Sequence, residues 1–132
     1  GNLSLTNLVS NLGVVSADVT GVGTARGYLA AASYGTDKAL FGYGYTGSNL
    51  SITNLVSNTG VVSADVTGVG TARRQLGAAG YGGDKAIFAY GASAGNQNMS
   101  NLVNNSGVVS ADVTGVGTER EATAAAGYSI SA

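Results

Sequence analysis

The chain has 132 residues, of which 44% are hydrophobic and only 10% are charged, and its formal net charge is −1. This balance predicts a folded domain and gives neither nucleic acid nor an anionic membrane an electrostatic reason to bind. His, Cys, Trp and Pro are absent. Their absence excludes a disulfide framework, a thiol nucleophile, a Ser-His-Asp triad and the usual zinc ligands. The sequence also lacks the run of about 18 apolar residues that a membrane span needs.

One run, GVVSADVTGVGT, occurs three times without change, starting at Gly13, Gly60 and Gly107. The spacing is 47 residues in both cases. A period of this length is typical of propeller blades and of helical solenoids. The 22 glycines and the many Val, Thr, Ser and Tyr residues disfavour the helical alternative.

Each unit is predicted to contain four short strands, because apolar residues mostly alternate with polar or small ones. Glycine-containing links between the strands fit hairpin turns. Small residues dominate the first strand of each unit, which suits strands that crowd around an axis. In the central unit the predicted strands span residues 75–81, 85–90, 99–104 and 108–113.

The predicted fold class is all-β, a β-propeller built from four-stranded blades whose ring is completed by self-association. Residues 1–132 form a single repeat domain with two complete units, 27–73 and 74–120, and two partial units, 1–26 and 121–132. The chain is nine residues short of three full units, and the deficit corresponds to 39–47, the second strand. The termini are expected to share one split blade. The gap invites an exogenous strand by β-augmentation.

These residues resemble the kelch repeat. Arg26, Arg73 and Arg120 stand where a kelch blade opens, each followed by a small-residue strand, and residues 40–44 stand where an apolar strand would end in a double glycine. Tyr43 splits that double glycine, and the fourth strand carries no Trp. The resemblance implies a kelch-like propeller that serves as a binding platform, and it names no catalytic residue. Such near-identical tandem units also look like repeat proteins of phage or environmental origin, or designed ones.

Motifs with catalytic or cofactor-binding chemistry are not expected here. Residues 42–47 fit G-x-G-x-x-G, but no helix follows and the next copy breaks the pattern, so we interpret them as a strand end and a loop. Asp18, Asp65 and Asp112 recur once per unit and are expected to cap turns through backbone N–H groups or to pair with Arg. We predict no catalytic residue, no metal and no cofactor.

The candidate ligand-binding side chains are therefore arginines and tyrosines. Two interpretations stay open for the arginines: ties between blades, to carbonyls or to the repeated Asp, or a ring of Arg and Tyr at one mouth of the channel that binds a carboxylate or a sugar. The second interpretation gives these candidates: Arg26, Arg73, Arg120, Tyr45 and Tyr90.

The expected function is non-enzymatic binding or scaffolding. Since three units do not close a ring, we expect a homodimer with six blades, with a glycan or a protein as its candidate ligand on a virion or cell surface. Neither nucleic acid nor a membrane is an expected partner. The alternative is a purely structural or designed self-assembling repeat protein with no ligand.

Overall fold

The computed structural model describes residues 1–128, in which two antiparallel three-stranded sheets and no helix are present. The all-β prediction is therefore confirmed, and the first three strands of the central unit begin and end within two residues of the predicted positions. None of the residues from 1 to 128 belongs to a helix able to cross a membrane. The first sheet contains β1 (Ala30–Tyr34), β2 (Lys38–Tyr45) and β3 (Asn49–Val56), and the second contains β4 (Gly77–Tyr81), β5 (Lys85–Ala89) and β6 (Ser100–Val103).

The predicted fourth strand of each unit forms only isolated bridges to the third. Along β6, Val103 faces Val109 and Ser100 faces Val113, so the fourth segment is one residue longer than the stretch it pairs with and bulges. Ser110 occupies the bulge: its N–H donates to the Leu102 carbonyl at 2.8 Å, and its hydroxyl accepts the Leu102 N–H at 3.2 Å. A side-chain oxygen thus replaces a backbone carbonyl in the ladder.

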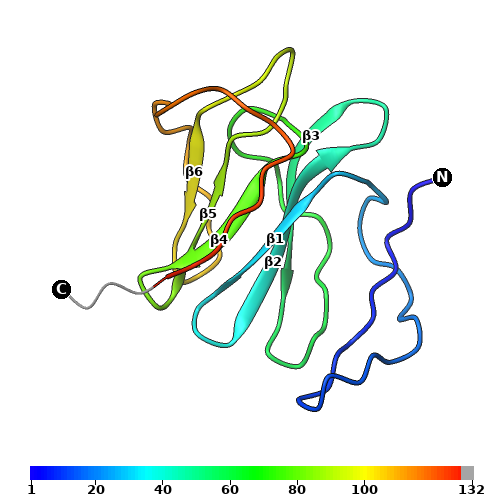
Figure 1. The fold of residues 1–132 in the computed structure, drawn as a ribbon. Coiled ribbons are helices and arrows are strands. Elements are labelled where there is room, and N and C mark those ends of the chain that lie inside the picture. The colour runs from blue at the N-terminus through cyan, green and yellow to red at the C-terminus, as the bar shows by residue number, and fades with distance from the viewer. Residues whose placement is uncertain (129–132) are drawn as a thin grey trace.

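The two sheets pack face to face, with the core between them (Figure 1). Gly42 on β2 makes the close approach possible, because a Cβ atom there would lie 2.6 Å from the ring of Phe88 on β5. The buried apolar residues of this core are Tyr34, Leu40, Tyr43, Leu76, Ala86, Phe88 and Val103.

The two partial units lie at opposite ends of this stack (Figure 1). The N-terminal segment forms an irregular hairpin, with bridges Thr6–Val19 and Val9–Val15, next to the face of the first sheet that points away from the second. Residues 122–128 run beside β4, where a Cβ on Gly77 would lie 3.3 Å from the Cβ of Ala125. A blade shared by the two termini would therefore join different copies of the chain.

Candidate functional site

Arginines and tyrosines alternate in one continuous column through the stack. Arg26 donates from Nε to the Tyr43 carbonyl at 2.7 Å, and Arg73 donates from Nε to the Tyr90 carbonyl at 2.8 Å. The guanidinium carbon of Arg73 lies 4.4 Å from the centre of the Tyr43 ring, and that of Arg120 lies 3.7 Å from the Tyr90 ring. The Nε hydrogen bonds join successive units, and each cation–π contact lies within one unit. We call the five residues the Arg–Tyr column: Arg26, Tyr43, Arg73, Tyr90 and Arg120.

Two arginines of the column, Arg26 and Arg73, are buried and well supplied with acceptors. Arg26 is 7% exposed and Arg73 is fully buried. Arg26 also donates from Nη1 to the Thr24 carbonyl at 3.1 Å and from Nη2 to Asn54 Oδ1 at 2.7 Å. Burial lowers the pKa of Arg26, and the nearby carboxylate of Asp65 opposes this shift. Both arginines donate to carbonyls of the next unit, which agrees with the interpretation that the arginines tie neighbouring units together. Their role in ligand binding stays a prediction.

Asp65 and Asp112 cap loops of the neighbouring unit, as the sequence predicts, whereas Asp18 accepts a hydrogen bond only from Asn7 among residues 1–128. Asp65 accepts the Thr24 N–H at 3.1 Å and the Thr24 hydroxyl at 2.6 Å. Asp112 repeats these contacts with Thr71 at 3.1 and 2.7 Å. Burial acts to raise the pKa of both carboxyls, but the hydrogen bonds from Thr and Asn side chains prevail and lower it.

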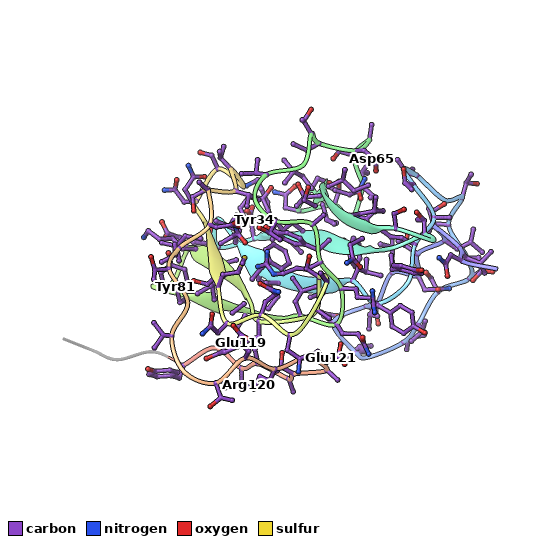
Figure 2. The ribbon with its side chains drawn as sticks, turned by 90° about the horizontal axis from the view of Figure 1, so that it is seen from above. Tyr34, Asp65, Tyr81, Glu119, Arg120 and Glu121 are labelled. Carbon is purple, nitrogen blue, oxygen red and sulfur yellow. The ribbon has the colours of Figure 1, made fainter. Side chains whose placement is uncertain are left out.

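The remaining predicted residues lie nearer the surface. Tyr45 is half-buried and stacks with Arg74, whose guanidinium carbon lies 5.1 Å from the ring centre. Arg120 is exposed at one edge of the molecule, between Glu119 and Glu121 (Figure 2). Tyr45 is therefore outside the Arg–Tyr column, and the structure does not bring it together with Arg26 and Arg73.

Tyr43 is the column residue that sequence reasoning missed as a site. The signal was available in the repeat, because 47 residues after Tyr43 comes Tyr90, whereas 47 residues after Tyr45 comes Ala92. Tyr43 has a positive φ of 63°, and so has Tyr90. A left-handed backbone is costly for a bulky side chain, so its recurrence indicates that the contacts of the ring compensate for it.

Three groups surround the Tyr43 side chain and define what we call the tyrosine niche. The guanidinium of Arg73 covers one face of the ring, as described above. The ring of Phe88 meets it edge-on, with centroids 5.1 Å apart and an interplanar angle of 61°. The Tyr43 hydroxyl donates to the Val69 carbonyl at 3.2 Å. Burial raises the pKa of Tyr43, and the charge of Arg73 opposes this shift, so the phenol is a neutral hydrogen-bond donor at physiological pH.

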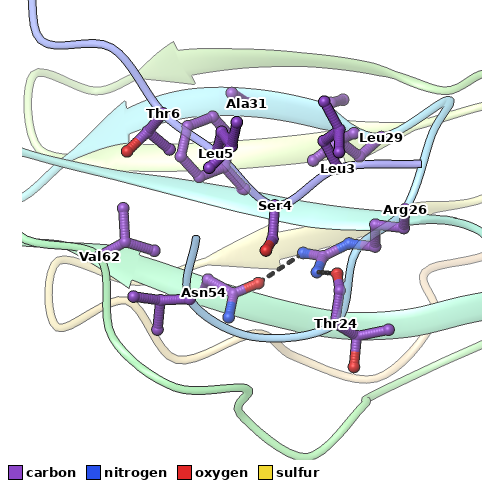
Figure 3. A pocket seen from close by; sticks show the side chains of 13 residues that line it. Leu3, Ser4, Leu5, Thr6, Thr24, Arg26, Leu29, Ala31, Asn54 and Val62 are labelled. Atoms are coloured by element: carbon purple, nitrogen blue, oxygen red, sulfur yellow. Dashed lines mark hydrogen bonds between the residues drawn. The ribbon is translucent and has the colours of Figure 1, made fainter. Parts of the chain in front are cut away.

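A pocket of about 290 Å³ opens between the N-terminal segment and the first sheet (Figure 3). Arg26 lies along its wall with hydrogen bonds to Asn54 and Thr24. The leucines that border it are only loosely covered: Leu3 is 71% exposed and Leu5 is 43% exposed. The pocket therefore combines apolar walls with one guanidinium group. Its sheet-side walls come mainly from Arg26, Leu29, Ala30, Ala31, Phe41, Asn54 and Val62.

Within residues 1–128 no group of three His, Cys, Asp or Glu side chains is placed to hold a metal ion. A scan against protein-family models gives no match to the chain, and no curated protein matches it.

Proposed function

We propose that the protein is a non-enzymatic β-repeat scaffold of the kelch-like propeller type, in which two copies join end to end and close a ring of six units. One observation carries the proposal: the outer face of the first sheet is only partly covered, by the N-terminal segment, whereas the same face of the second sheet is buried. Leu76 is 5% exposed beneath the first sheet, but its repeat equivalent Leu29 is 37% exposed.

The C-terminal segment supplies a surface that fits this open face. Gly77 lies against Thr123 and Ala125 in the stack. In the proposed assembly, the 47-residue period would bring Ala124 of one copy against Leu29 and Ala31 of the next. Ala124 and Ala31 are both exposed in the single chain. Burying such paired apolar surfaces is the main driving force for association. It also removes exposed sheet surface that favours aggregation.

The solution mass tests this proposal. Light scattering coupled to size-exclusion chromatography is expected to give a particle of two chains of 12.9 kDa each. Ala31→Glu places a charge in the proposed contact and is expected to yield a monomer. The matched control is Val61→Glu, since Val61 is 65% exposed on the hairpin that follows β3, and it should leave the mass unchanged. A wild-type monomer at all concentrations would refute the assembly.

We also propose a ligand-binding surface on this scaffold. Among the predicted ligand-binding residues, Tyr45, Tyr90 and Arg120 retain exposed surface, and each belongs to an Arg–Tyr stack. Aromatic rings beside guanidinium groups suit a sugar or a carboxylate-bearing protein side chain. A glycan array probed with the wild type and with Tyr45→Ala tests this point, and binding that is lost in the variant is the expected result.

A further inference from the structure

The pocket beside the N-terminal segment is the empty repeat equivalent of the tyrosine niche. The niche around Tyr43 consists of Arg73, Phe88 and the Val69 carbonyl. Moving each of these back by one period of 47 residues gives Arg26, Phe41 and Val22. All three line the pocket.

The surroundings of the pocket repeat those of the niche as well. Leu76 belongs to the core cluster around Tyr43, and Ala78 and Val109 pack against it. Their equivalents one period earlier line the pocket: Leu29, Ala31 and Val62. The pocket therefore has the walls of a site that, elsewhere in the same chain, holds a buried tyrosine.

The backbone beside the pocket also has room for a strand. In the first sheet, β3 pairs with β2 on one side, through Thr53–Gly42 and Val56–Ala39, and with the fourth segment on the other. The equivalents in the N-terminal segment, Thr6 and Val9, have bridges only on the fourth-segment side within residues 1–128. Val9 is 62% exposed. The edge corresponding to β2 is therefore free to accept an added strand.

We propose that this pocket is a binding site for a tyrosine side chain carried on an extended strand of a second polypeptide. The strand would pair with the N-terminal segment where β2 pairs with β3. Its phenol ring would lie over Arg26 with its edge toward Phe41, and its hydroxyl would donate to the Val22 carbonyl. The site adjoins the end-to-end contact proposed above, since Leu29 and Ala31 border both, but its contacts to the tyrosine come from Arg26, Phe41 and Val22.

The pocket should discriminate between two tyrosines on the same strand. In β2, Tyr43 occupies the niche and Tyr45 stacks on Arg74. One period earlier, Arg26 stands in place of Arg73, but Gly27 stands in place of Arg74. A bound strand of β2 sequence would thus find a partner for its first tyrosine and no guanidinium for its second.

A synthetic peptide of residues 36–47 with an N-terminal fluorophore provides the test, by anisotropy titration against the unmodified full chain. Saturable binding is expected. Tyr43→Ala in the peptide should weaken it about tenfold or more, because the cation–π and edge contacts are lost. Tyr43→Phe should weaken it less, through the hydroxyl alone, and Tyr45→Ala is the matched control that should bind like the parent. Because only the peptide changes, the fold of the protein is not at issue.

Two results would overturn the proposal: no binding of the parent peptide, or equal binding of the parent and Tyr43→Ala peptides. Light scattering on the same samples distinguishes a failure of the tyrosine site from a failure of the proposed two-chain ring. A monomer that binds the peptide with the expected order of affinities refutes only the two-chain ring. A two-chain particle that does not bind the peptide refutes only the tyrosine site.

Discussion

At the residue scale, the contribution of each recurring aspartate to stability depends on the hydrogen bonds it accepts from a neighbouring unit. Asp112 accepts bonds from the N–H and hydroxyl of Thr71 and from Asn101 Nδ2. Asp18 occupies the same position in the N-terminal segment, where Asn7 is its one hydrogen-bond partner among residues 1–128. Asp112→Ala should therefore lower the free energy of unfolding by about 2 kcal/mol. Asp18→Ala should lower it by about 0.5 kcal/mol or less. Urea unfolding followed by tyrosine fluorescence measures both, and equal losses would contradict this account.

The same carboxylates predict how stability depends on pH. The pKa values of Asp65 and Asp112 are lowered below the ordinary 3.8 in the folded chain. Their contribution is therefore fully present above about pH 4 and is lost as the pH falls through the lowered values. We expect an unchanged urea midpoint from about pH 7 to about pH 5, and a decrease at about pH 3. Asp112→Asn should make the decrease of the urea midpoint at low pH smaller. A decrease of the same size in that variant would show that the Asp112 carboxylate does not cause it.

At the scale of an element, the bulged fourth segment depends on one hydroxyl per unit. Ser110, Ser63 and Ser16 each accept a backbone N–H of the third strand, at 3.2, 3.0 and 3.0 Å. Ser110→Ala should leave the Leu102 amide without its acceptor, and its hydrogen exchange should become about tenfold faster. The matched control is Ser106→Ala, since the Ser106 hydroxyl has no bond to the described residues. NMR measures the hydrogen-exchange rate of the Leu102 amide in both variants. An unchanged rate in Ser110→Ala would show that the bulge does not need the hydroxyl.

At the scale of the whole molecule, the period specifies which residues should meet between copies. The chain contains no cysteine, so Ala31→Cys together with Ala124→Cys introduces a single designed pair. The repeat-equivalent Cβ positions are 3.3 Å apart, close to the separation that a disulfide requires. Mild oxidation should link chains covalently, as seen on a non-reducing gel. Val61→Cys with Ala124→Cys is the control, and linkage of similar extent in both variants would count against the end-to-end contact.

Much of this architecture follows from the repeat, but the position of Tyr43 does not. Exact tandem copies, hairpin turns and alternation predict the all-β fold and the capping role of the aspartates. Alternation also places Phe41 and Tyr43 on one face of β2. In the structure the ladder shifts register between Gly42 and Gly44. Phe41 consequently borders the pocket, whereas Tyr43 packs against Phe88 of the second sheet. A left-handed residue inside a strand is a property of the backbone that a period-two pattern does not encode.

The capping of one unit by the next has a consequence for how the chain is made. Thr24 leaves the ribosome 41 residues before Asp65, the carboxylate that holds its loop, and Thr71 waits equally long for Asp112. Each unit can therefore collapse as it emerges, but its loop is capped only after the aspartate of the following unit has been synthesised. During synthesis, each unit should therefore become stable only when nearly one further unit has been made. The most recently made loop should be the least ordered part of the nascent protein.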